Sequence, residues 1–271
     1  MKNLRLLIMC FVFPVMVKGE TFSGHILNKK TNVPVEYANI GVLKKNIGTV
    51  ADNYGKYTLS IDPQYDNDTL MVSCIGFKSQ MFKIADFKKL EDHNIYLEEK
   101  VTEVPPVVVR PRIFKQKILG VTTKSKLASA GFEDNKLGYE CGILMKSAKS
   151  AILEKVNINF SYCAYDTILY RLNIYRKTDQ KEFENILQEP IFLKLSKDKT
   201  RETVSIDMKP YDLIIQGDFL VTLEHIRDLG TGRLFFCCGL SGRTYYRKTS
   251  QGTWESIPIG ISISVQAKVE K

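Results

Sequence analysis

One short segment near the C-terminus carries side chains suited to holding a ligand. Around a Ser-Gln-Gly turn, residues 242–255 place Arg243, Tyr245, Tyr246, Arg247 and Trp254. Flat aromatic rings stack on the apolar faces of sugars, and Arg and Gln side chains bond to hydroxyl groups. These five residues are therefore the candidate ligand-binding site. Large aromatic side chains are mostly buried, however, so a β-hairpin with Trp254 and one Tyr packed in the core is the favoured interpretation.

The sequence offers little for catalysis. It has no GxSxG, HExxH or EF-hand pattern, and its three histidines, His25, His93 and His225, are scattered along the chain. A zinc site needs three or four converging ligands, so we expect no metal and no cofactor. Glu224 and Glu255 are a candidate glycosidase pair, but such a pair requires a separation of roughly 5–10 Å that only coordinates can show.

The acidic turn at residues 66–68 offers oxygen atoms to calcium. It lacks the later bidentate acid that completes such a site, and a polar turn is the favoured interpretation.

The N-terminus resembles an export signal. Lys2 and Arg5 precede twelve uncharged residues at 6–17, and Lys18 and Gly19 follow. Twelve helical residues span about 18 Å, well short of the roughly 30 Å core of a bilayer. We predict a secretory signal at residues 1–19, with a buried N-terminal helix as the alternative. The mature chain is then exported, to the periplasm or the cell surface, and associates with a membrane only through a partner.

Composition limits the remaining classes. The chain has 271 residues, of which 44% are hydrophobic and 25% charged, so it is neither disordered, fibrous nor a polytopic membrane protein. Its formal charge of +9 falls to +6 without the three basic residues of the signal, and the basic residues are scattered. We therefore expect no nucleic-acid partner.

Five cysteines remain after removal of the signal, an odd number that leaves at least one thiol unpaired. Most are expected to be small core residues. A single disulfide between Cys141 and Cys163 is an alternative that the sequence allows but does not predict.

Residues 20–99 predict a small antiparallel β-sandwich, because short strands and turns follow each other closely. The expected strands cover residues 22–27, 37–43, 48–51, 57–61, 69–75, 79–84 and 94–97.

These turns and strands carry a family resemblance. The residues are Gly24-His25-Ile26-Leu27-Asn28, Pro34-Val35, Ala38-Asn39-Ile40, Gly48-Thr49, Asp52-xx-Gly55-x-Tyr57 and Ile75-Gly76-Phe77. In this order they resemble the carboxypeptidase-regulatory-like domain of exported Bacteroidetes-type proteins, which often begins TonB-dependent receptors. The resemblance implies a transthyretin-like, carbohydrate-binding-like fold without catalytic residues. Too few residues follow for a receptor's transmembrane barrel.

Residues 100–117, with prolines at 105, 106 and 111, predict a linker that has room for one strand. From residue 118 to 271, apolar and polar residues alternate again, for example at 156–162, 168–175, 204–208, 219–224 and 259–270. Alternation predicts half-buried strands and a larger jelly-roll-like β-sandwich, with a short helix at 179–188. This half loosely resembles jelly-roll regions of uncharacterised exported Bacteroidetes proteins. The expected fold class is all-β, with two sandwiches.

Function is less constrained than fold. We expect a non-catalytic protein of the cell envelope that recognises a carbohydrate or a protein. One alternative is a periplasmic accessory subunit of an outer-membrane receptor or transport complex. Another is a glycan-active hydrolase whose site lies in the second sandwich.

Overall fold

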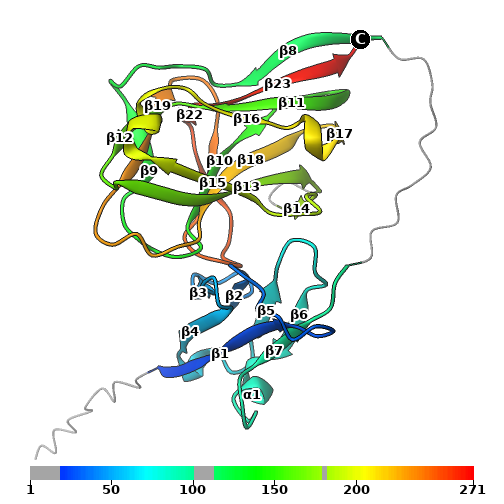
Figure 1. Ribbon diagram of the computed structural model, residues 1–271, viewed down its shortest axis with the longest axis vertical. Coiled ribbons are helices and arrows are strands. Elements are labelled where there is room, and N and C mark those ends of the chain that lie inside the picture. Colours follow the sequence, from blue (N-terminus) through cyan, green and yellow to red (C-terminus); the bar gives the residue numbers. More distant parts are fainter. Residues whose placement is uncertain (1–18, 101–112, 179–181) are drawn as a thin grey trace, which may run out of the picture.

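The computed structural model describes residues 19–100, 113–178 and 182–271. It shows two β-domains that lie end to end, the first at the bottom of Figure 1 and the second at the top. The predicted all-β fold with two sandwiches is confirmed. Residues 1–18 of the predicted signal and residues 101–112 of the predicted linker lie outside the described residues. No helix within the described ranges has the length and apolar character needed to cross a bilayer.

The first domain contains two small sheets with strand orders β4-β1-β7 and β3-β2-β5-β6. Its strands are β1 Glu20–Asn28, β2 Asn39–Val42, β3 Gly48–Val50, β4 Lys56–Ile61, β5 Thr69–Ser73, β6 Gln80–Lys83 and β7 Ile95–Leu97. A 3-10 helix, η1 (Pro63–Tyr65), follows β4, and a one-turn helix, α1 (Ile84–Phe87), follows β6. All seven strands overlap the segments predicted from the succession of short strands and turns.

The expectation of purely antiparallel pairing is wrong at one place. Strand β7 runs parallel to β1, with Ile26 opposite Ile95. After β6 the chain passes through α1 and returns to the first sheet, where β7 pairs with β1 on the edge opposite β4. A connection that crosses over through other elements permits a parallel partner. Alternating hydrophobicity identifies a strand but not the direction of its neighbour.

The second domain consists of larger sheets. A seven-stranded sheet has the order β14-β13-β18-β10-β20-β21, with β15 also on β13; the others are β16-β11-β23-β8, with β17 on β11, and β12-β19-β22, with β9 on β19. The strands are β8 Phe114–Gly120, β9 Ser129–Phe132, β10 Glu140–Met145, β11 Ser150–Ile158, β12 Phe160–Cys163, β13 Thr167–Lys177, β14 Phe183–Asn185, β15 Ile191–Ser196, β16 Val204–Asp207, β17 Ile214–Gln216, β18 Phe219–His225, β19 Leu234–Gly239, β20 Thr244–Arg247, β21 Glu255–Ile257, β22 Gly260–Ile261 and β23 Ile263–Glu270, with 3-10 helices η2 Lys197–Arg201 and η3 Lys209–Tyr211.

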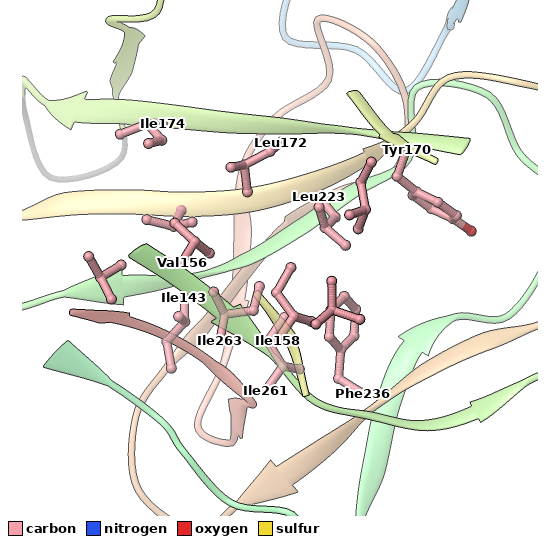
Figure 2. Packing of buried hydrophobic residues seen from close by; sticks show 14 of the residues in the cluster. Ile143, Val156, Ile158, Tyr170, Leu172, Ile174, Leu223, Phe236, Ile261 and Ile263 are labelled. Atoms are coloured by element: carbon pink, nitrogen blue, oxygen red, sulfur yellow. The ribbon is translucent and has the colours of Figure 1, made fainter. Parts of the chain in front are cut away.

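Alternation along β13 builds the core of the second domain. Tyr170, Leu172 and Ile174 point into one apolar cluster, where they meet side chains from facing strands, such as Ile158 and Ile263 (Figure 2). All five are fully buried. Burying such a side chain contributes roughly 1.5–3 kcal/mol, so this face holds the sheets together. The residues between them on β13 therefore point to the opposite face of the sheet.

Two predicted long strands are each interrupted once. The run 156–162 breaks at Asn159, between β11 and β12, and the run 259–270 breaks at Ser262, between β22 and β23. The two residues face each other, and Asn159 Nδ2 donates to Ser262 Oγ at 2.9 Å. At each of these two residues the chain passes between two sheets, one that contains β11 and β23 and one that contains β12 and β22.

The segment predicted as a short helix at 179–188 contains a strand instead. Residues 183–185 form β14, which pairs antiparallel with the end of β13, with Phe183 opposite Lys177. Pairing with the long β13 edge satisfies backbone groups that a short isolated helix would leave open. Residues 179–181 lie outside the described residues. Strand β8 begins at Phe114, within the predicted linker, as the allowance for one strand there anticipated.

The five described cysteines are all free thiols, so the bridge between Cys141 and Cys163 does not form.

The turn at Ser250 docks against the first domain. Gly41 and Gly48 lie opposite each other on β2 and β3, and a Cβ at either position would come within 2.4 Å of the Ser250 carbonyl oxygen. Thr249 Oγ1 donates to the Gly48 carbonyl at 2.7 Å, and Gln251 Nε2 donates to Ser73 Oγ at 2.8 Å. The two glycines thus allow a close approach of backbones across the domain junction.

We expect Gly41→Ala to weaken this docking, because the new methyl group collides with a backbone carbonyl that cannot rotate away. Overpacking of this kind costs about 1–3 kcal/mol. Small-angle X-ray scattering should show a larger radius of gyration, and denaturant unfolding a lower midpoint. Gly217→Ala is the control, since no atom lies within 4 Å of its added Cβ. It strains its own loop but should leave the radius unchanged. A Gly41→Ala protein with wild-type scattering would contradict the role of this contact.

Candidate functional site

Four charged residues form a row across the seven-stranded sheet. Arg171 on β13 lies opposite Glu224 on β18, Glu224 lies opposite Glu140 on β10, and Glu140 lies opposite Arg247 on β20. Directly opposed residues of neighbouring strands share one face of a sheet. The order of charges is therefore positive, negative, negative, positive. Arg171 and Glu224 alternate along their strands with the core residues Tyr170, Leu172 and Leu223, so the row lies on the sheet face opposite that core.

The row is buried, and each carboxylate has its own arginine. Arg171 contacts Glu224 Oε2 through Nε at 3.1 Å and Nη2 at 2.7 Å. Arg247 contacts Glu140 Oε2 through Nε at 2.8 Å and Nη2 at 2.6 Å. Both glutamates are 0% exposed. Ionised groups are costly to bury unless they are paired and hydrogen-bonded, and these two pairs meet that requirement.

A second tier of polar groups bridges the two central carboxylates. Asn173 Nδ2 donates to Glu140 Oε1 at 2.9 Å and to Glu224 Oε2 at 2.8 Å. Thr222 and Tyr175 also donate hydroxyl hydrogen bonds to Glu140. One oxygen, Glu224 Oε1, has no hydrogen-bond partner among the described residues. Arg247 Nη2 lies 4.0 Å from it.

The two carboxyl groups have different electrostatic environments. Burial raises the pKa of Glu140, and Arg247 opposes this rise without cancelling it. Burial also acts to raise the pKa of Glu224, but Arg171 and Arg247 more than offset it and leave that pKa below its usual range. Two close carboxyl groups seldom ionise to the same extent, and here the arginines favour ionised Glu224.

The first domain completes the row. Arg171 Nη1 donates to the Tyr37 carbonyl at 2.8 Å, and Nη2 donates to Asn39 Oδ1 at 2.8 Å. Arg171 is 2% exposed and thus fully covered. One guanidinium therefore joins the carboxylate of Glu224 to the backbone and side chain of the other domain.

Beside the row lies a cleft of about 410 Å³ between the domains. Arg171, Asn173, Tyr175 and Arg247 line it from the sheet. The remaining lining residues are Asn39, Met71, Ser73, Cys74, Ile75, Gly76, Phe77, Ser79, Lys100, Phe183, Glu184, Asn185, Leu187 and Gln251. The cleft thus combines aromatic edges with amide, hydroxyl and charged groups, a mixture that suits a polar ligand with apolar faces.

The structure divides the five residues predicted as a ligand site. Trp254 is 9% exposed and packs on Tyr175, and the Arg247 guanidinium lies 5.0 Å from its ring centre. Tyr245 joins this group through Phe183, with ring centres 5.4 Å apart. Trp254 is thus a core residue, in agreement with the favoured interpretation of the sequence.

The other two predicted residues lie elsewhere. Tyr246 points to the opposite face of β20, stacks on Tyr139 and donates to Glu255 Oε2 at 2.8 Å. Arg243 donates to Ser256 Oγ at 3.2 Å on the exposed side. The Ser-Gln-Gly turn between them and Trp254 is buried in the domain junction, so the segment does not form one exposed platform.

Glu140, Arg171 and Asn173 were not selected from the sequence. The sequence feature that could have revealed them is alternation along β13, which places Arg171 and Asn173 on the face opposite the core residues. Glu224 on β18 lies opposite Arg171 and shares that face. The sequence suggests Glu224 and Glu255 as a glycosidase pair, but in the structure Glu255 contacts Tyr246 and Lys248.

The described part of the chain contains no cluster of three His, Cys, Asp or Glu side chains fit to hold a metal ion. His225 is buried, its Nε2–H donates to the Arg227 carbonyl oxygen at 2.7 Å, and burial lowers its pKa. At residues 66–68, Asp66 pairs with Lys88 at 2.7 Å, as a polar turn would.

A double-mutant cycle tests the coupling of Arg171 and Glu224. Arg171→Met leaves a buried carboxylate without its main partner, which typically costs about 3–5 kcal/mol. Glu224→Gln removes that charge, so the double variant should lose less free energy of unfolding than the two single variants together.

The pH dependence sharpens the test. In Arg171→Met the pKa of Glu224 should rise above its unfolded value, so the penalty is present at neutral pH and shrinks as pH falls through the folded-state pKa. Denaturant unfolding at neutral and mildly acidic pH measures this. Additive losses, with no relief in acid, would show that the two groups are uncoupled.

Comparison with known proteins covers the first domain. Residues 22–109 match the family model of the CarboxypepD_reg-like domain, whereas no curated protein matches the chain. The match confirms the resemblance expected for the first domain and its transthyretin-like sandwich.

Proposed function

We propose that this is a non-catalytic, exported protein of the cell envelope that recognises a carbohydrate in the cleft between its two domains. The observation that carries the proposal is the cleft itself, about 410 Å³ in volume, with polar side chains held in fixed positions beside aromatic edges. Sugars need both features, because their ring faces are apolar and their hydroxyl groups point outward. The predicted signal and the family of the first domain support export in a Bacteroidetes-type bacterium.

Rigid positioning favours binding. Asn185 is partly exposed in the cleft, and its Nδ2 is fixed by a hydrogen bond to Asn173 Oδ1; Gln251 is fixed in the same way by Ser73. Side chains that are already ordered lose little conformational entropy when a ligand arrives. The entropic cost of binding would then come mainly from the ordering of the ligand.

The carboxylate pair supports binding over hydrolysis. Glu140 and Glu224 lie close together, as glycosidase carboxylates do. Both are 0% exposed and covered by arginines, and neither lines the cleft. A general acid must reach the glycosidic oxygen within hydrogen-bond distance, and these groups face protein instead.

Blocking the cleft tests the proposal. Ser79 is exposed and lines the cleft, so Ser79→Trp places a large ring in it with little effect on the core. Ser60→Trp makes the same change at an exposed position of β4 and is the matched control. A glycan array followed by calorimetry should identify a sugar bound by the wild type and by Ser60→Trp. Ser79→Trp should bind at least about tenfold more weakly, a loss of about 1.4 kcal/mol.

Three results would overturn the proposal. The wild type would retain no glycan, both variants would bind equally well, or the bound glycan would be hydrolysed. Hydrolysis that Glu140→Gln abolishes, with binding and thermal stability preserved, would instead assign an enzyme. Capture of an envelope protein that Ser79→Trp abolishes, without glycan binding, would assign the cleft to a protein partner.

A further inference from the structure

Far from the interdomain cleft, the second domain has a hollow surrounded by lysines. It lies where β8 and β23 meet the turn between β10 and β11, and β8 and β23 form the end of the molecule opposite the first domain (Figure 1). We call it the basic hollow; it has a volume of about 390 Å³ and is lined by Lys115, Lys117, Leu119, Lys146, Ser147, Ala148, Lys149, Val269, Glu270 and Lys271.

Strand geometry brings the first two lysines together. Lys115 and Lys117 are two residues apart on β8 and therefore point to the same side. They lie opposite Val269 and Ala267 of β23. Both lysines are exposed. The pairing of β8 with β23 thus holds two ammonium groups on one wall of the hollow.

The opposite wall is a fixed turn. Asp218 accepts a hydrogen bond from the Ser147 backbone at 3.1 Å and pairs with Lys146 Nζ at 2.6 Å. Ser147 Oγ donates to the Lys149 carbonyl at 2.8 Å. These contacts order the turn that carries Lys146 and Lys149, and so fix the position from which their side chains reach out.

The charges around the hollow do not balance. Among the described residues, the ion pairs involve one of these lysines, Lys146, whose partner Asp218 also anchors the turn. Glu270 is the one acidic side chain among the described residues that line the hollow. Ammonium groups gathered on one concave surface repel each other and raise the local concentration of anions.

We propose that the basic hollow binds a phosphate-bearing ligand. A phosphate group carries close to two negative charges and three strong acceptor oxygens, which matches several ammonium groups that each offer three donors. Lysine acts as a point charge toward phosphate and needs no planar arrangement. The site is separate from the cleft and does not depend on the carbohydrate proposal. The phosphate belongs either to a free phosphorylated compound or to a lipid headgroup.

A triple variant tests the proposal. Lys115→Gln, Lys117→Gln and Lys149→Gln together remove three charges and leave the Lys146–Asp218 contact that orders the turn. Exposed substitutions of this kind usually change stability by less than about 0.5 kcal/mol. The matched control, Lys30→Gln, Lys56→Gln and Lys89→Gln, removes three exposed charges from the first domain. Equal melting temperatures of the two variants verify that both are folded.

Two probes distinguish the sources. Calorimetry with inorganic pyrophosphate measures free phosphate, and flotation with phosphatidylcholine vesicles, with and without phosphatidic acid, measures headgroups. Loss of even one charge-assisted contact of about 1.5–3 kcal/mol weakens binding about tenfold or more. We expect the wild type and the control to bind, and the triple variant to bind at least tenfold more weakly.

Binding of pyrophosphate alone would support a free phosphorylated ligand. Binding to vesicles that contain phosphatidic acid, with competition by pyrophosphate, would support a lipid headgroup. Absence of binding to both probes would overturn the proposal. An equal loss in the control would also overturn it, because net charge alone would then explain the attraction.

Discussion

The arrangement of this protein depends on a buried row of charges that neither domain satisfies alone. On the seven-stranded sheet, Glu140 and Glu224 lie side by side, and each needs an arginine to offset the cost of burial. Arg171 in turn requires acceptors beyond its carboxylate, and it finds them at Tyr37 and Asn39 of the first domain. An unmatched charge at this depth would cost several kcal/mol, so docking and charge pairing stand or fall together.

Such a network contributes more to specificity than to stability. Apolar replacements of similar volume are often as stable as a buried ion pair. A slip of one residue in β10, however, would turn Glu140 into the apolar core that Cys141 and Leu223 occupy, where it has no partner. The charge row therefore specifies the register of four strands, and with it the shape of the cleft. Gly41 and Gly48 specify the other side of the junction by allowing the Ser250 turn to approach.

Sequence patterns predicted the strands well and their surroundings poorly. The succession of short apolar segments and turns placed the strands of the first domain, and period-two alternation identified the two faces of β13. The same alternation could not show that the face with Arg171 and Asn173 is covered, because its cover comes from Asn39, 132 residues away. Arg247 was selected as a ligand contact, yet its role as an ion-pair partner depends on Glu140, which lies 107 residues earlier. Contacts of this range follow from the tertiary fold and leave no local mark.

Differential scanning calorimetry of the intact wild-type protein tests the shared charge row most directly. If the row joins the two domains into one cooperative unit, heat unfolding gives a single transition whose calorimetric and van't Hoff enthalpies agree. Two separate transitions, each with the enthalpy of one domain, would contradict this, because each sandwich would then be stable without the contacts that Arg171 makes across the junction.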